Sequence, residues 1–240
     1  MDVQTSLSRI RTQLGGMERM VRLLRAEIEG HIAEVDPAGL DSWTEIPTGL
    51  GQLFEAAVPL PAVAVEPYKH FAKDVWVGLD AEMGDTGATV SLKALHRAGA
   101  QTGRGVARLS LNPVFPMAAK PRWVTLETAV SVEALKRAKG LRIDTISFFD
   151  IAAGNSAQIP RSVTLNLRLH RRDGRATDHL NYRIPVSTMP FEHSARIAPA
   201  AMDDLALDDV SEALMILELP LAGTYALKLD HFAVLALDEG

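Results

Sequence analysis

Apolar side chains recur at alternating steps of four and three residues along the first 35 positions of the chain. These steps average about 3.5 residues, which is the coiled-coil repeat rather than the repeat of an ordinary surface helix. Proline disfavours helical geometry in the residue before it, so the helix is predicted to end at Asp36-Pro37. The pattern therefore predicts an α-helix of coiled-coil spacing over residues 1–35.

We expect this helix to self-associate. Additional apolar residues at Met20, Leu23 and Ile32 widen the stripe, which suits three or more strands or a helix that packs on its own domain. Both outcomes stay open at this point, and so does the oligomer number. The expected oligomerisation seam consists of Leu7, Ile10, Leu14, Met17, Val21, Leu24 and Ile28.

Residues 36–73 change in character, because five prolines and three glycines arrive in this stretch. Prolines at this density fit neither a helix nor a central strand. The only helical pattern here is a short one around residues 50–57. The composition predicts a partly ordered connector between the helix and the remainder of the chain.

From about residue 74 the hydrophobic period changes to two. In the clearest predicted strand, Ser162–His170, four apolar residues alternate with polar ones, and Asp173-Gly174 favours a hairpin turn after it. Ser131 is expected to cap a short helix that reaches Lys139. Further strands are predicted at residues 75–80, 88–94, 105–111, 122–130, 141–149, 180–184, 213–219 and 224–237, with a change of phase at residues 230–231. Nine or ten short strands without long helices between them predict a mainly β, antiparallel sandwich over residues 74–240.

Part of this β body resembles a known superfamily. Arg122-Trp123 opens a strand that is followed by the short helix and a second strand, and the chain closes with the apolar pattern of residues 224–237. This succession is similar to the galactose-binding-like jelly roll. Many members of that superfamily are carbohydrate-binding modules, so the resemblance implies a jelly-roll-like sandwich that recognises glycans. Some members hold a structural calcium ion, for which Asp80 or Glu82 with Asp230 could supply two ligands. The sequence offers no third ligand, so neither a metal site nor any other cofactor is predicted.

The composition of the chain argues against several classes of partner and site. A net charge of −5 argues against a nucleic-acid binder, and the absence of cysteine excludes disulfides and thiolate zinc sites. The longest apolar stretch without a charge, residues 56–65, contains two prolines and is too short for a membrane span. No apolar leader pattern is present near the start of the sequence. We therefore expect the chain to be cytoplasmic, or to be exported without an N-terminal signal peptide.

Catalytic signatures are sparse. The seven histidines show no metal-ligating spacing, and no G-x-S-x-G motif is present. Asp85-Thr86-Gly87 matches the aspartic-protease triplet, but it stands between two predicted strands, where these are ordinary turn residues. Glu127, Glu133, Asp144 and Asp150 are interpreted as exposed charges on strand edges. No catalytic residue is predicted, and a binding role is favoured over an enzymatic one.

The best candidate binding surface is the polar face of a basic segment, because residues 161–200 carry seven arginines against three acids. Alternate residues of the predicted hairpin would project from one sheet face beside an aromatic side chain, where they could contact sugar hydroxyls or an acidic glycan. A solvated strand face would show the same pattern. An acidic stretch at residues 203–209 is interpreted as a solvated loop. The candidate ligand-binding residues are Trp123, Asn166, Arg168, His170, Asn181, Tyr182 and Arg183.

These observations predict a non-catalytic module that binds a carbohydrate or polysaccharide and is presented in several copies by the helix. Linked copies would raise the avidity of weak sugar contacts without any new contact. One alternative is a structural or assembly protein whose sandwich docks another protein. A second alternative is a polysaccharide-modifying enzyme on a β-sandwich scaffold, which would require paired carboxylates in a cleft.

Overall fold

The structure of the chain is a computed structural model that describes residues 43–56, 58–80, 88–95, 106–113, 122–151, 162–221 and 223–237. The helix predicted over residues 1–35 and its expected seam lie outside the described residues. Glu82 and residues 85–87 lie outside them as well. Within the described ranges, no helix has the length and apolar character that a membrane crossing requires.

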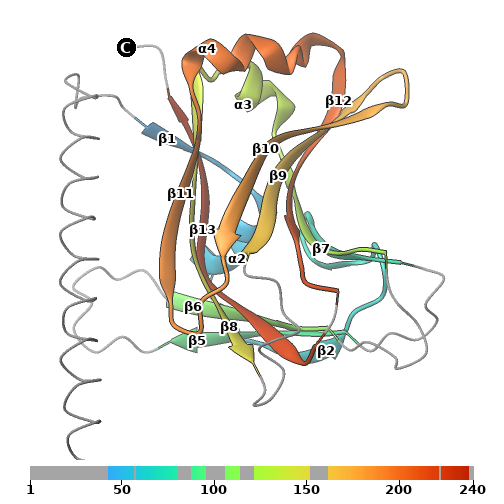
Figure 1. The fold of residues 1–240 in the computed structure, drawn as a ribbon, viewed down its shortest axis with the longest axis vertical. Coiled ribbons are helices and arrows are strands. Elements are labelled where there is room, and N and C mark those ends of the chain that lie inside the picture. The colour runs from blue at the N-terminus through green and yellow to red at the C-terminus, as the bar shows by residue number, and fades with distance from the viewer. Residues whose placement is uncertain are drawn as a thin grey trace, which may run out of the picture. The chain divides into compact units, whose positions relative to one another are not determined.

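The described residues form two antiparallel sheets (Figure 1). In spatial order, the first sheet contains β11 (Phe191–Ile197), β8 (Gly140–Ile151), β13 (Tyr225–Leu237), β6 (Val106–Asn112), β5 (Thr89–Leu95) and β2 (Leu60–Ala64), and β1 (Trp43–Ile46) also pairs with β13. The second sheet contains β10 (Ala176–Pro185), β9 (Ser162–Arg171), β12 (Val210–Glu218), β7 (Val124–Val130), β4 (Val75–Leu79) and β3 (His70–Ala72). The helices are α2 (Gly49–Ala56), α3 (Val132–Arg137) and α4 (Pro199–Met202), with 3-10 turns at Asp203–Leu205 and Leu207–Asp209. The prediction of a mainly β chain with antiparallel sheets is confirmed.

The predicted hairpin forms between β9 and β10, which pair in antiparallel register. At its corner Gly174 has a φ of +84°, and its N–H donates to the Arg171 carbonyl oxygen over 3.0 Å. Glycine adopts a positive φ without a steric penalty, which is why it suits this corner.

Two smaller predictions are also confirmed. Ser131 caps α3, where its hydroxyl accepts a hydrogen bond from the Ala134 N–H. The change of phase predicted near the end of the sequence is a β-bulge, because the pairing of β13 with β8 shifts between Leu229 and His231. A bulge inserts one extra residue, so the alternation resumes beyond it with the opposite parity.

Elements also form where the pattern predicted little order. β1, β2 and β3 all lie within residues 36–73 and add strands to the two sheets, while α2 forms at the short helical pattern expected around residues 50–57. β2 and β3 stand at sheet edges, where a proline such as Pro61 removes no bond from the ladder. β11 was not predicted either, because its inward positions include His193 and Ala195, which give a weak apolar signal.

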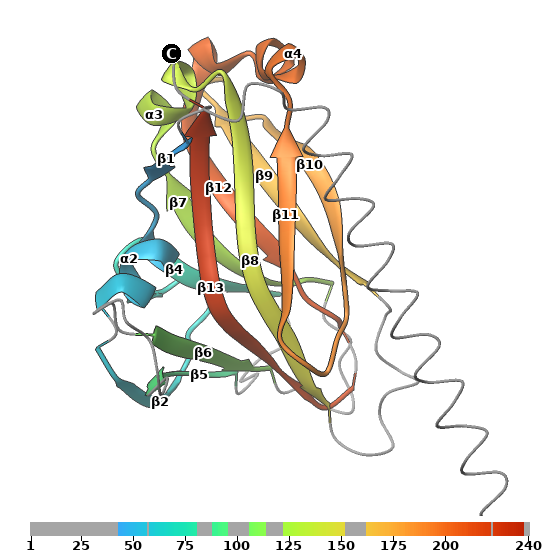
Figure 2. The ribbon, with the colours of Figure 1, turned by 90° about the vertical axis from the view of Figure 1, so that its left-hand side faces the viewer.

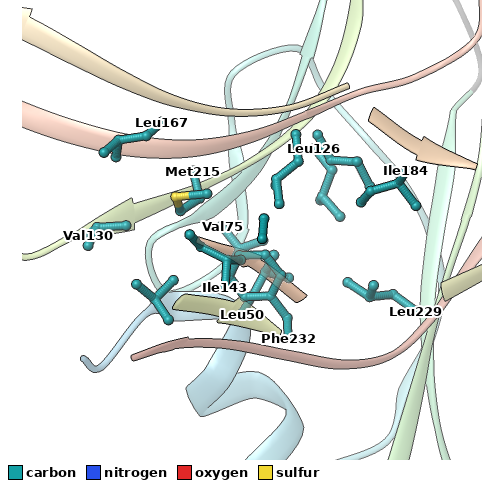
Figure 3. Close-up of a cluster of buried hydrophobic side chains, with 14 of the residues drawn as sticks. Leu50, Val75, Leu126, Val130, Ile143, Leu167, Ile184, Met215, Leu229 and Phe232 are labelled. Atoms are coloured by element: carbon teal, nitrogen blue, oxygen red, sulfur yellow. The ribbon is translucent and has the colours of Figure 1, made fainter. Parts of the chain in front are cut away.

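The core lies between the two sheets (Figure 3). Alternate side chains of each strand point inward, so both sheets contribute and α2 adds Leu50. Burial is nearly complete at Leu126 and Ile143, which are each 1% exposed. The buried cluster includes Val75, Leu126, Val130, Leu167, Ile184 and Met215 from the second sheet and Ile143, Leu229 and Phe232 from the first.

β13 organises the first sheet, and Figure 2 shows its long ribbon beside β8, which separates it from β11. β8 pairs along almost the whole of one edge of β13. The other edge is divided between two strands: β6 pairs at residues 227–229 and β1 pairs at residues 234–237. One strand therefore joins residues from the beginning, middle and end of the described chain.

Candidate functional site: a groove on the outer face of the second sheet

A groove of about 820 Å³ lies on the outer face of the second sheet, over parts of β3, β4, β7, β9 and β12. Strand alternation determines which side chains line it. In β7, Leu126 points into the core and its neighbour Glu127 points into the groove. In β9, Leu167 is a core residue and Arg168 lines the groove.

The floor of the groove is an apolar cluster separate from the main core. Trp76, Leu214 and Ile216 pack together, with Ala129 against them. Trp76 is 8% exposed, and its indole Nε1–H donates to Glu127 Oε2 over 3.0 Å. The floor therefore presents a large aromatic side chain that is fixed by a carboxylate.

The position of Glu127 corrects an expectation from the sequence. Glu127 is only 6% exposed and belongs to a central strand of its sheet, so its interpretation as an exposed charge on a strand edge was wrong. Its carboxylate accepts hydrogen bonds from the Trp76 indole and from the Thr125 hydroxyl. Both donors are neutral, and together they hold a buried carboxylate in one orientation beneath the groove.

Gly78 makes room for this arrangement. A Cβ atom at Gly78 would lie 2.3 Å from Thr125 Oγ1, 2.5 Å from Glu127 Oε1 and 3.3 Å from a ring carbon of Tyr68. Glycine inside a strand often marks a close approach of other groups, and here the groups are the polar pair of the floor and an aromatic side chain of the rim.

Aromatic side chains continue from the floor to the rim. The His70 ring stacks on Trp76 with a centroid separation of 4.7 Å and an interplanar angle of 9°. At the rim, the Trp123 indole donates to the Tyr68 hydroxyl over 2.8 Å, and these side chains belong to residues that are 37% and 51% exposed. Leu221 adds a further exposed apolar side chain. The rim thus exposes apolar surface in a fixed place.

An ion pair supports the Trp123 side of the rim. The Arg122 guanidinium lies 5.0 Å from the centre of the Trp123 ring. Its Nε and its backbone N–H both donate to Asp80 Oδ2, at 2.9 and 3.1 Å, and Asp80 is 4% exposed. Asp80, as an alternative to Glu82, was matched to a calcium ligand together with Asp230, and Asp230 accepts two hydrogen bonds from Arg108. Among the described residues, no group of three or more potential metal ligands is present.

The opposite side of the groove is polar. Arg168 donates to both carboxylate oxygens of Asp178, at 2.7 and 2.8 Å, and this hydrogen bonding holds the pKa of Asp178 below its ordinary value. Glu212, Glu218 and His170 also line this side. Carboxylates, an imidazole and a guanidinium together can both donate hydrogen bonds to hydroxyl groups and accept them.

The groove brings together three of the seven candidate residues, namely Trp123, Arg168 and His170. Asn166 is 5% exposed and serves the framework, since its amide donates to Glu218 Oε1 and its oxygen accepts from the Asn181 N–H. Arg183 is exposed on β10 and pairs with Thr164, outside the groove lining.

A bulge in β10 separates the remaining candidates from the groove. The register shifts between His179 and Tyr182, and the two residues inside the shift, Leu180 and Asn181, have φ values of +77° and +44°. Tyr182 therefore pairs with the inward-facing Leu165 and packs against the core, with its ring edge toward His193. Without this bulge, the inward and outward positions of β10 beyond His179 would be exchanged.

Several lining residues were missed by the sequence analysis. Tyr68 and His70 lie in the stretch interpreted as a connector, and Trp76 lies in a predicted strand whose residues are all buried. The available signal was Trp76 followed at the next alternate position by Gly78, since a glycine among large strand residues indicates that another group approaches closely. Glu212 and Glu218 gave no comparable signal.

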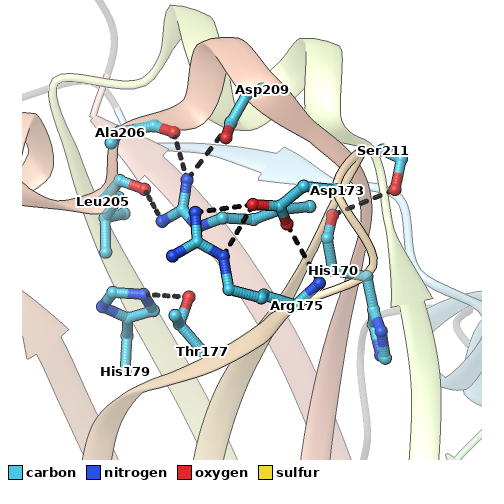
Figure 4. A network of polar contacts seen from close by, with 10 residues as sticks. His170, Asp173, Arg175, Thr177, His179, Leu205, Ala206, Asp209 and Ser211 are labelled. Atoms are coloured by element: carbon cyan, nitrogen blue, oxygen red, sulfur yellow. Dashed lines mark hydrogen bonds and ion pairs between the residues drawn. The ribbon is translucent and has the colours of Figure 1, made fainter.

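The basic and acidic segments of the sequence meet beside the groove (Figure 4). Arg171 donates to the carbonyl oxygens of Leu205 and Ala206, at 3.1 and 2.8 Å, and pairs with Asp209. The Ser211 hydroxyl donates to the His170 carbonyl oxygen over 3.0 Å. These contacts fix the end of β9, where His170 reaches the groove.

Comparisons with known proteins give a consistent but distant likeness. No family model matches the chain, and no curated protein matches it. A xylan-binding domain of carbohydrate-binding module family 22 from Paenibacillus barcinonensis is similar in structure, at 13% identity and a TM-score of 0.43, over 76% of this chain and 97% of that domain. A family 11 carbohydrate-binding module from Clostridium thermocellum in complex with a β-1,3-1,4-mixed-linked tetrasaccharide has 13% identity and a TM-score of 0.40, over 76% and 99% of the two chains.

A third similar structure is a putative sugar-binding protein from Bacteroides thetaiotaomicron, at 9% identity and a TM-score of 0.41, over 78% of this chain and 99% of that one. The resemblance to carbohydrate-binding modules that the strand pattern suggested is therefore also found among solved structures.

Proposed function

We propose that the chain is a non-catalytic, jelly-roll-like module that binds a carbohydrate chain in the groove of the second sheet. The single observation that carries this proposal is the exposed, hydrogen-bonded pair of Trp123 and Tyr68 at the rim of an open groove lined by carboxylates. Exposed aromatic surface beside convergent polar groups is typical of a ligand site.

The chemistry of the groove matches that of a sugar. A pyranose ring presents C–H groups on its faces and hydroxyls around its edge. The faces complement aromatic rings such as Trp123, and the hydroxyls complement Glu212, Glu218 and His170, which line the same groove. An extended chain suits a groove that opens to solvent across several strands.

The rim is organised before any ligand arrives. Trp123 is held by its bond to Tyr68 and lies beside Arg122, which is itself bonded to Asp80. A side chain that is already fixed loses little conformational freedom on binding, so more of the contact energy appears as affinity.

Replacing Trp123 with alanine is expected to weaken glycan binding at least about tenfold, which corresponds to about 1.4 kcal/mol. The full chain is first tested by calorimetric titration against soluble xylan, mixed-linked β-glucan and polygalacturonate, and the variant is then titrated with whichever glycan binds. Phe191→Ala is the matched control, because Phe191 is an aromatic residue with 38% exposure on the first sheet. We expect this control to bind as the unchanged chain does.

If no glycan in a broad panel of neutral and acidic glycans bound to the chain, the proposal would be contradicted and the docking of another protein would be favoured. If Trp123→Ala and Phe191→Ala lost equal affinity for the glycan, the groove would not be its binding site. The same mixtures are assayed for new reducing ends, because Glu127, Glu212 and Glu218 line one groove and an enzyme would need such carboxylates. Cleavage of a glycan would show that the chain is an enzyme and would contradict its proposed role as a non-catalytic binding module.

We further propose that the heptad pattern of residues 1–35 presents the module in several copies, which would raise avidity for a polymer. Changing Leu14 and Val21 together to aspartate places charges in the seam and is expected to lower the mass measured by light scattering to that of a monomer. The control places aspartates at Thr12 and Ala26, outside the apolar seam, and should keep the oligomer. An equal mass for the unchanged chain and the seam variant would contradict self-association through these residues.

A further inference from the structure

Two arginines face each other on the outer side of the first sheet, away from the groove. Arg196 of β11 and Arg142 of β8 are directly opposed partners in the antiparallel ladder. Side chains at directly opposed positions are close neighbours on one face of the sheet, and like charges in such a pair repel each other. This part of the sheet therefore carries an electrostatic cost that needs a compensating group.

Both guanidinium groups lie over the same aromatic ring. The guanidinium carbon of Arg142 lies 5.1 Å from the centre of the Trp43 ring, and that of Arg196 lies 5.9 Å from the same point. Trp43 belongs to β1, which pairs with the last part of β13, so its side chain reaches the two arginines from across the sheet. A guanidinium over an aromatic ring keeps its N–H groups available for other acceptors.

Protein carboxylates neutralise only part of this charge. Arg142 Nε donates to Asp144 Oδ2 over 3.1 Å, and both side chains are partly exposed. Within the ranges that the structure describes, no carboxylate forms an ion pair with Arg196, whose residue is exposed. The cluster of Trp43, Arg142, Asp144 and Arg196 thus combines two cations with one anion.

We propose that Arg142 and Arg196 bind an oxyanion group at this cluster, at a site separate from the groove. The planar fork of a guanidinium matches an oxyanion with two parallel hydrogen bonds, and an anion between the opposed arginines would convert their repulsion into attraction. Sulfate, phosphate and carboxylate share this chemistry. The site would take such a group as a free ion or as a substituent of a larger molecule, and it does not depend on the proposed function of the groove.

The test follows the arginine Nε–Hε cross-peaks of the ¹⁵N-labelled full chain by NMR. Sodium sulfate, sodium phosphate and sodium glucuronate are titrated separately, each against sodium chloride at the same ionic strength. At least one of the three oxyanions is expected to shift the Arg142 and Arg196 peaks to saturation, whereas chloride gives no saturation. The glucuronate arm distinguishes the carboxylate of an acidic sugar from a tetrahedral oxyanion.

Arg196→Gln keeps most of the side chain but removes the opposed charge, and it is expected to weaken the apparent affinity reported by the Arg142 peak at least tenfold. Arg183→Gln is the matched control, because Arg183 is an exposed arginine on the second sheet, and it should leave the titration unchanged. A spectrum of the variant without added anion verifies that it is folded. Peaks that respond equally to chloride, or an Arg196→Gln variant that binds as tightly as the control, would overturn the proposal.

Discussion

Replacing Gly49 with alanine is expected to destabilise the fold by about 3 kcal/mol. A Cβ atom at this position would lie 2.4 Å from the Lys73 carbonyl oxygen and 2.6 Å from that of Asp74. Both are backbone atoms of the turn between β3 and β4, so no side-chain rotation relieves the clash. The turn is also fixed from its other side, because the Asp74 oxygen accepts hydrogen bonds from the Ala129 N–H and the Thr128 hydroxyl.

Gly51, two residues further along α2, provides the matched control for this prediction. The nearest atoms to a Cβ there would be the side-chain oxygens of Thr48 and Glu45, at 3.1 and 3.3 Å, and the Phe232 carbonyl oxygen at 3.7 Å is an ordinary van der Waals contact. Alanine also favours the helix over glycine by about 0.5–1 kcal/mol. We expect Gly51→Ala to unfold in urea within about 1 kcal/mol of the unchanged chain. Equal urea midpoints for the two variants would show that the turn yields easily and would contradict the expected clash.

The loss of Trp76 is the second large effect that we expect. Trp76→Ala empties the floor of the groove and should lower the free energy of unfolding by about 3–5 kcal/mol, the usual cost of truncating a buried aromatic side chain. Trp76→Phe keeps most of the apolar contact but removes the indole donor to Glu127. A hydrogen bond to a charged group contributes about 1.5–3 kcal/mol, so the phenylalanine variant should lose about 2 kcal/mol.

Comparing Trp123→Ala with Trp76→Ala distinguishes an effect on glycan binding from an effect on stability. Trp123 lies at the exposed rim, so its removal should cost less than about 1 kcal/mol of stability while it weakens glycan binding. Unfolding is followed by circular dichroism, because each variant changes the tryptophan fluorescence. If Trp76→Ala and Trp123→Ala lost equal stability, the floor would not be the packed cluster described above.

The alternation of apolar and polar residues along the chain was sufficient to predict many strands of this fold. The apolar run of β9, the Asp-Gly corner after it and the Ser131 cap each depend on neighbouring residues, and each prediction is confirmed. β1, β2 and β3 depend instead on partners far away in the chain. These short segments, of which β2 contains a proline, form strands because an edge of β13, β5 or β4 is available to them.

The site was less predictable for the same physical reason. Arg168 and His170 could be placed on a polar face from alternation alone, and they line the groove together with Trp123. The place of Tyr182 depends on the bulge in β10, which turns its side chain toward the core, and a bulge depends on backbone geometry that a simple alternation does not encode. The partner of Glu127 was hidden as well, since its hydrogen bond to Trp76 joins strands whose pairing emerges only in the fold.

The division of one β13 edge between β6 and β1 has a consequence for biosynthesis. β1 and its partner segment in β13 are about 190 residues apart, so β1 leaves the ribosome long before the strand that it pairs with has been synthesised. β6 and β8 each have an edge that cannot pair until β13 has been synthesised, whereas the β9–β10 hairpin can form as soon as it emerges from the ribosome. Until β13 arrives, the nascent chain carries strand edges that could pair with other chains. The timing of translation, rather than the strength of any single strand, therefore decides when the first sheet can close.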